Sequence, residues 1–244
     1  MFILKDNWLT PDSTHVIFDF HLPGYPVVPG AISAGLIHQT YCEEFNHADS
    51  DIDIVFQQPI TSDARLKLSI SSNLSELIDS NGKTSVRLLP TTSIKKPNII
   101  LLSNFKKLAS RITRPPELIF HHEFISNENL AECSIHYENL LLSRPYLSSL
   151  KYASYFIVLE TMGNLAMELC AINTQEVFLF HSFKGVWFDW LSITGEITIT
   201  TSARRINTRI IQWSSQVKNK NHELVGYVNM GLNILNLPTR SIMF

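Results

Sequence analysis

The stretch His21-Leu-Pro-Gly-Tyr-Pro-Val-Val-Pro-Gly30 carries more structural information than any other part of the chain. Prolines and glycines fill half of its ten positions, so it predicts a loop rich in turns. Pro29 stands where the first turn of a helix tolerates a proline, and a helix is expected from Ala31 to about Phe45. The run His15–Phe20 before the loop resembles a β-strand. The sequence therefore predicts a strand, a loop and a helix in that order.

Downstream of this helix, alternating apolar residues predict an antiparallel set of strands. Asn81-Gly82 is typical of a turn between two of them. The expected strands are Ile52–Ile60, Ala64–Ile70, Thr84–Leu89 and Asn98–Phe105.

The second half of the chain repeats the same order. Ser148 or Ser149 is expected to cap a helix that runs to about Leu169. The expected strands are Glu117–Phe124, Ala131–Tyr137, Val177–Trp190, Gly195–Thr201, Thr208–Trp213 and Glu223–Leu235. Arg114-Pro115-Pro116 predicts the boundary, which gives an N-terminal half over residues 1–115 and a C-terminal half over 116–244. Neither half alone is large enough to bury a generous core, so the halves are expected to pair face to face.

The loop resembles that of the β-hydroxyacyl-carrier-protein dehydratase family, which reads roughly His-Phe-Pro-x-x-Pro-Val-x-Pro-Gly. The matching residues are His21, Pro23, Pro26, Val27, Pro29 and Gly30. Phe56–Ile60 also resembles the family's strand after its helix. The resemblance implies an α+β fold, a double hotdog. In that fold, two tandem halves each have a long central helix wrapped by an antiparallel sheet, and they pack as a pseudo-dimer, as in polyketide synthase dehydratase domains.

The position of the acid departs from the family pattern. The family carries its Glu or Asp fourteen residues after the histidine, and Gly35 stands there in this chain. In the second half, Glu160–Ala166 resembles the family's acidic helix segment, whereas Tyr146 stands fourteen residues before Glu160. We therefore expect one complete site, made of His21 and Glu160, and one lost site. His38, one turn after Gly35, is either a relic of the lost site, which we favour, or a polar core residue.

Eliminating water from a β-hydroxyacyl thioester requires a base, a proton donor and a group that stabilises charge on the carbonyl oxygen. Neutral His21 suits the first role, because the ordinary pKa of histidine lets it accept a proton near neutrality. Glu160 suits the second role if it is protonated, which its apolar neighbours Phe156–Leu159 favour. The backbone N–H groups of Gly30 and Ala31, at the start of a helix, suit the third role.

Two further side chains are candidates for substrate binding. Asn164 lies four residues after Glu160, on the same helix face, and is expected to hydrogen-bond the Glu160 carboxyl or the substrate hydroxyl. Tyr25 is expected to flank the acyl entrance. No step of the elimination requires a metal or an organic cofactor, and the acyl group is expected to arrive on the phosphopantetheine of an acyl carrier protein. The candidates for a basic patch that would receive this acidic partner are Lys95, Lys96, Arg144 and Lys151.

Composition excludes several other classes of protein. The 244 residues include 20 basic and 22 acidic side chains, a balance that argues against a nucleic-acid partner. The three cysteines form no CxxC pair, which argues against a zinc site or a disulfide framework. The most apolar stretch, Tyr152–Leu159, is too short to span a membrane, and the N-terminus lacks the features of a signal peptide. A cytoplasmic protein is expected.

Three functions remain open at this point. The first is a dehydratase of the hydro-lyase class, acting in fatty-acid, polyketide or polyene synthesis. The second is an inactive dehydratase-like partner or scaffold that binds a carrier protein or an active homologue, as a homo- or hetero-oligomer with another hotdog protein. The third is a hotdog thioesterase, which would use the acid to activate water; the His-Pro loop favours dehydration instead.

Overall fold

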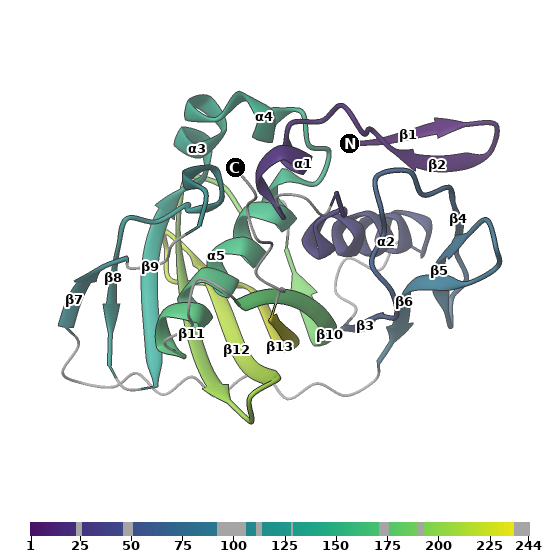
Figure 1. Cartoon of the computed structure of the whole chain (residues 1–244). Helices are drawn as coiled ribbons and strands as arrows, with labels where there is room; N and C mark the ends of the chain where they lie inside the picture. Colours follow the sequence, from purple (N-terminus) through teal and green to yellow (C-terminus); the bar gives the residue numbers. More distant parts are fainter. Residues whose placement is uncertain are drawn as a thin grey trace, which may run out of the picture.

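A single antiparallel sheet and two long helices make up the core of the protein (Figure 1). The computed structural model describes residues 1–22, 26–45, 51–91, 106–110, 114–127, 129–170, 176–189 and 193–236. In this part of the chain the 13-stranded sheet has the order β1-β2-β4-β5-β6-β3-β10-β13-β12-β11-β9-β8-β7. An antiparallel sheet with a few helices confirms the predicted fold class, whereas its description as a double hotdog stays a prediction.

The described part of residues 1–91 contains six strands and two helices. The strands are β1 (Phe2–Lys5), β2 (Trp8–Pro11), β3 (Ile52–Phe56), β4 (Leu66–Ser69), β5 (Ser75–Asp79) and β6 (Thr84–Pro90), and the helices are α1 (Ile17–Phe20) and α2 (Gly30–Phe45). The sequence predicted β3, β4, β6 and α2, and it missed β1, β2 and β5. The turn at Asn81-Gly82 is confirmed, since Gly82 has a φ of 79° and its N–H bonds the Asp79 carbonyl.

The remaining strands and helices follow Lys106. They are β7 (Lys106–Ala109), η1 (Pro116–Leu118), β8 (Glu123–Ser126), β9 (Leu130–His136), α3 (Tyr137–Ser143), α4 (Pro145–Ser148), α5 (Ala153–Leu169), β10 (Glu176–Phe188), β11 (Glu196–Arg205), β12 (Ile210–Asn219) and β13 (Leu224–Asn236). The predicted strand over Asn98–Phe105 lies outside the described residues.

Helix α5 is the centre of the core. Its residues Phe156, Ile157, Val158 and Leu159 are all 0% exposed, so the helix is covered on every side at this level. It packs against α2 on one side and against β11 and β9 on another (Figure 1). A helix that is apolar all round requires such burial. A charged residue placed on this part of α5 therefore lies inside the protein.

The two halves share one sheet because β3 pairs with β10. The paired residues are Ser182 with Val55, Phe183 with Ile54 and Val186 with Ile52. Strand β7 precedes the expected boundary at residues 115–116, yet it pairs with β8, which follows that boundary. The division into 1–115 and 116–244 stays a prediction.

The predicted strand over His15–Phe20 is wrong, because residues Ile17–Phe20 form the short helix α1. The Asp12 carboxylate accepts hydrogen bonds from the backbone N–H and the hydroxyl of Thr14 and starts a turn. Ile17 and Phe18 are both buried, although they are adjacent. A half-buried strand would send these two side chains to opposite faces, whereas this turn of helix buries both.

Two boundaries in the second half also differ from the sequence prediction. The segment Glu117–Phe124 begins as the 3-10 helix η1 and becomes a strand only at Glu123. Neither Ser148 nor Ser149 caps α5, because their hydroxyls donate backwards to the carbonyls of Pro145 and Tyr146. These bonds belong to α4 and to the turn after it, and α5 begins later, at Ala153.

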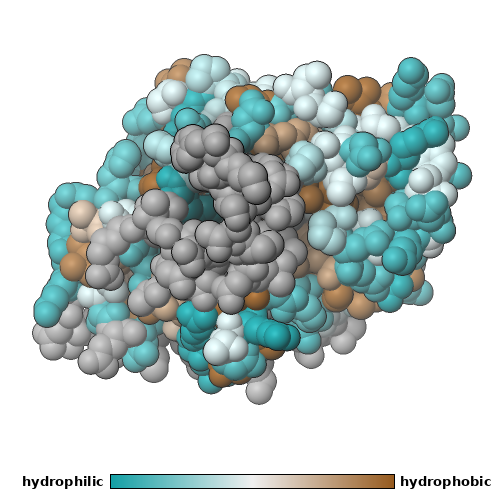
Figure 2. Space-filling view, in the orientation of Figure 1, coloured by the Kyte–Doolittle hydropathy of each residue, from teal (hydrophilic) through white to brown (hydrophobic). Residues whose placement is uncertain are grey.

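The face shown in Figure 2 is mainly hydrophilic where its residues are described, with hydrophobic side chains in small separate groups. In the described ranges, no helix is both long and apolar enough to cross a bilayer.

Candidate active site

Helix α1 carries His21 into the core. The backbone N–H of His21 bonds the Ile17 carbonyl at 2.9 Å and closes the helix. His15, just before α1, contacts the Ser149 hydroxyl through its Nε2 atom at 3.0 Å. This contact ties α1 to the second half of the chain, so His21 points toward α5.

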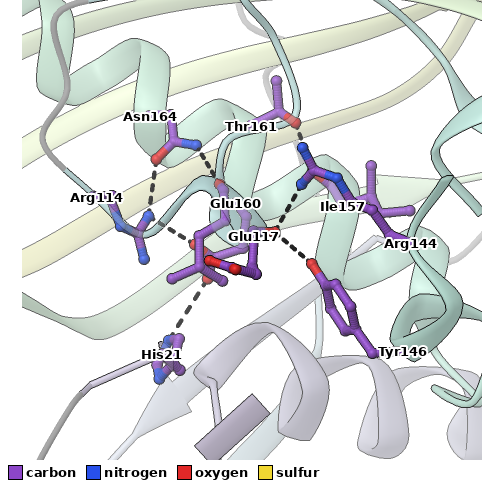
Figure 3. A network of polar contacts seen from close by, with 10 residues as sticks. His21, Arg114, Glu117, Arg144, Tyr146, Ile157, Glu160, Thr161 and Asn164 are labelled. Carbon is purple, nitrogen blue, oxygen red and sulfur yellow. Dashed lines mark hydrogen bonds and ion pairs between the residues drawn. The ribbon is translucent and has the colours of Figure 1, made fainter. Parts of the chain in front are cut away.

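His21 and Glu160 lie next to each other, as predicted (Figure 3). His21 Nε2 is 3.8 Å from Glu160 Oε1, and the two side chains are 11% and 5% exposed. A direct hydrogen bond would be shorter than this, at about 2.7–3.2 Å. The two side chains are therefore not hydrogen-bonded to each other, and a substrate oxygen beside them can bond both.

Arg114 also reaches Glu160, a contact that the sequence analysis missed. Its Nη1 atom donates to Glu160 Oε2 at 2.8 Å (Figure 3). Glu160 therefore has a charged partner in addition to its apolar neighbours Phe156–Leu159. The sequence held no local signal for this role, since Arg114 stands alone before two prolines.

Asn164 holds Arg114 rather than binding Glu160 directly. Its Oδ1 atom accepts from Arg114 Nη1 at 2.8 Å, and its Nδ2 atom donates to the Leu118 carbonyl at 2.8 Å. Asn164 is 0% exposed. The guanidinium is thereby fixed between a carboxylate and an amide oxygen, both on α5.

The backbone from Arg114 to Ile119 is fastened from a second side. Arg144 donates to the carbonyls of Glu117 at 2.7 Å and Ile119 at 2.6 Å, and the Tyr146 hydroxyl also donates to Glu117. Figure 3 shows these groups next to the Arg114–Glu160 pair. Arg144 also fastens this backbone, and its expected place in a basic patch stays a prediction.

Gly30 and Ala31 form the first turn of α2, where a helix offers no acceptor for their N–H groups. The Phe180 ring lies directly over Gly30, since an added Cβ would stand 2.4 Å from its Cδ2 atom. Packing against Phe180 therefore requires the motif glycine. Tyr25 lies outside the described residues, as do Lys95 and Lys96.

Burial sets the protonation of His21. It lowers the pKa of His21 from 6.5 to about 4, against the Glu160 carboxylate, which raises it, and with Arg114, which lowers it further. The imidazole is consequently neutral near pH 7 and able to accept a proton.

Comparisons with known proteins identify the fold. The chain matches no family model and no curated protein. The dehydratase domain of PpsC from Mycobacterium tuberculosis, bound to C12:1-CoA, superimposes with a TM-score of 0.64 at 13% identity, over 96% of this chain and 97% of that one. The dehydratase domain from the CurJ module of the Curacin polyketide synthase gives 0.66 at 16% identity, over 97% and 96%. A trans-acyltransferase polyketide synthase enoyl-isomerase gives 0.60 at 13% identity, over 85% and 90%.

This chain has the fold of a polyketide synthase dehydratase domain. The resemblance drawn from the loop at His21–Gly30 is thus confirmed at the level of the fold, which is as far as identities this low reach.

The location expected for a second site in this dehydratase fold is filled. Gly35 lies against Tyr152 and Tyr155, and Tyr155 exchanges a hydrogen bond of 2.6 Å with His38 Nδ1. Burial lowers the pKa of His38 to about 3. His38 therefore occupies the dehydratase-fold core as a neutral, hydrogen-bonded polar residue.

A groove of about 700 Å³ lies on the sheet rather than beside His21. Its lining includes the consecutive β12 residues Gln212, Trp213 and Ser214, and it includes neither His21 nor Glu160. Within the described part of the dehydratase fold, no three His, Cys, Asp or Glu side chains gather to hold a metal. That the reaction needs no metal or cofactor stays a prediction.

Proposed function

We propose that this protein removes water from a β-hydroxyacyl thioester, carried on the phosphopantetheine of an acyl carrier protein, to give the trans-2-enoyl thioester. One observation carries the proposal: a neutral imidazole and a carboxyl group meet inside the protein, 3.8 Å apart, from opposite halves of the chain. The dehydratase fold of the solved structures supports it. The pathway is fatty-acid, polyketide or polyene synthesis.

Each group has a place in this reaction. His21 removes the α-proton, which the thioester carbonyl acidifies. Glu160 binds the β-hydroxyl beside it. The N–H groups of Gly30 and Ala31 bind the carbonyl oxygen, on which negative charge grows as the α-proton leaves.

The test offers a β-hydroxyacyl carrier-protein thioester to the protein and follows the mass of the acyl chain. We expect the wild type to remove one water molecule, and His21→Ala to lower the rate by about 100-fold or more. Glu160→Ala should be similarly slow. His122→Ala and Glu196→Gln are matched controls, because both side chains are exposed. Equal turnover by wild type and His21→Ala would refute the assignment.

A second candidate is a non-catalytic, carrier-binding partner. The Arg114–Glu160 ion pair favours it, because it keeps the carboxyl engaged within the protein. Carrier protein binding without turnover on any chain length, measured in the same assay and by titration calorimetry, would support this second function.

A further inference from the structure

We propose that Arg114 is a positioning residue that keeps Glu160 as a carboxylate, so that Glu160 accepts the substrate's hydroxyl hydrogen bond while His21 makes both proton transfers. The inference rests on the proposed dehydration and names the proton donor for its second step. It also gives a role to an arginine that no sequence motif marks.

The two carboxyl oxygens of Glu160 have different neighbours. Oε2 accepts from Arg114 at 2.8 Å, and Oε1 is the atom nearest His21, at 3.8 Å. The ion pair is almost fully desolvated on the Glu160 side, which is 5% exposed, and Arg114 is 19% exposed. A charge-assisted bond in such surroundings is among the stronger hydrogen bonds in proteins. Protonating Glu160 would weaken it, so Glu160 is poorly suited to give up a proton.

The second support is that Arg114 is itself held in place. Asn164 accepts from the same nitrogen and bonds the Leu118 carbonyl, four residues after Arg114. Arg144 and Tyr146 fasten the Glu117 carbonyl from the other side. These hydrogen bonds fix the position of the guanidinium. Glu160 lies between it and His21.

The third support is the set of charges around Glu160. Among the described residues, the titratable and charged groups that interact with it are His21 after α1, Arg114 before η1, and Tyr146 on α4. Arg114 is the permanent cation among them. Burial, with Glu160 among the smaller causes, raises the pKa of Tyr146 to about 12, so this hydroxyl stays neutral. A neutral His21 beside an anionic Glu160 and a cationic Arg114 is therefore the resting state.

The elimination balances with His21 alone. The Nε2 lone pair takes the α-proton, and the electrons of the Cα–H bond form the Cα=Cβ bond as the Cβ–O bond breaks. The leaving oxygen takes the same proton back from the imidazolium, which the Glu160 carboxylate stabilises meanwhile. Water and the enoyl thioester depart. His21 is neutral again, and Glu160 and Arg114 end as they began.

The pH profile of kcat/KM shows whether His21 or Glu160 donates the proton to the leaving hydroxyl group. If His21 returns the proton, the wild-type profile is flat above neutrality and falls only on the acid side, where His21 becomes protonated. Arg114→Met should lower kcat by about 100-fold at pH 7.5 with little change in KM, and the loss should grow as the pH is lowered, because Glu160 without its cationic partner is then protonated and no longer accepts the hydroxyl hydrogen bond. Arg114→Lys, which keeps the charge, should recover at least about a tenth of the wild-type rate with a flat profile. Arg87→Met, which removes another Arg–Glu pair, is the control.

A wild-type rate that falls tenfold for each pH unit above neutrality would overturn the inference, as would a wild-type profile in Arg114→Met. The state of Glu160 can also be measured without turnover, by the infrared difference between wild type and Glu160→Gln. We expect the carboxylate bands at pH 6. A protonated carboxyl band there would refute the role of Arg114, even if the protein proved to be the non-catalytic partner.

Discussion

Gly35 on α2 lies in contact with Tyr152, the residue just before α5. A Cβ atom on Gly35 would stand 2.9 Å from the Tyr152 Cβ and 3.1 Å from the Tyr155 Cβ. The two long helices therefore meet where the resembling family carries its carboxyl group. A glutamate at this position would force the helices apart, so the packing leaves no room for a carboxyl group at position 35.

Gly35→Ala should destabilise the protein by about 1–3 kcal/mol, because its methyl group overpacks this contact. Gly163→Ala on α5 is the matched control, since its added Cβ would meet only Trp213, at 3.8 Å. That substitution should stabilise the helix by about 0.5–1 kcal/mol. Urea unfolding of the three proteins measures both effects. A Gly35→Ala protein as stable as the wild type would contradict the packing argument.

Acid should destabilise the protein below pH 6.5 through its buried histidines. Burial lowers the pKa from 6.5 to about 4 for His21, about 3 for His38 and about 4 for His121. Between pH 6.5 and these values the unfolded chain binds more protons than the folded one, so the free energy of unfolding falls as the pH falls. His38→Gln should flatten this dependence, as measured by urea unfolding from pH 8 to pH 4. Parallel curves for the two proteins would rule out His38 as a contributor.

Gly30→Ala should lower kcat/KM for dehydration by roughly tenfold or more, because the methyl group would collide with the Phe180 ring and displace the first turn of α2. A second change, Phe180→Leu, removes that ring edge and should restore part of the activity in the double variant. Steady-state kinetics of the two single variants and the double variant give the coupling. Additive losses would mean that Phe180 does not constrain Gly30.

Arg144→Lys should loosen the segment from Arg114 to Ile119, because lysine cannot donate to two carbonyls with a planar fork. We expect a loss of about 1–3 kcal/mol in the free energy of unfolding, together with a lower kcat. Arg204→Lys is the control, since Arg204 is exposed and bonds only the Gln212 side chain among the described contacts. Unchanged hydrogen exchange in residues 114–119 of Arg144→Lys would argue against this role.

The sequence predicted the two long helices and the pairing of His21 with Glu160. Both helices have local signals, a proline-glycine start for α2 and a long apolar run for α5. The pairing is a long-range relationship, and it was reached only through the resemblance, which assigns the histidine and the acid to opposite halves. Local patterns carried no information about their distance.

The parts that escaped prediction depend on tertiary contacts. The helical turn of α1 follows a side-chain turn at Asp12 and buries two adjacent residues, which alternation does not reveal. Arg114 becomes important only because α5 brings Glu160 and Asn164 to it, 46 and 50 residues further along the chain. Ser148 and Ser149 have the composition of helix caps, but a preceding short helix uses their hydroxyls.

The position of β7 governs how the polypeptide can be produced as two fragments. A break between Pro115 and Pro116 would strand β7 on the wrong fragment and leave β8 with a bare edge. A break between Thr91 and Lys106 would keep β7 and β8 on the same fragment. The two fragments could then associate through the pairing of β3 with β10. Two fragments that end and begin between these residues should reassemble into one active complex when they are co-expressed. Recovered activity would then report that the two fragments have associated.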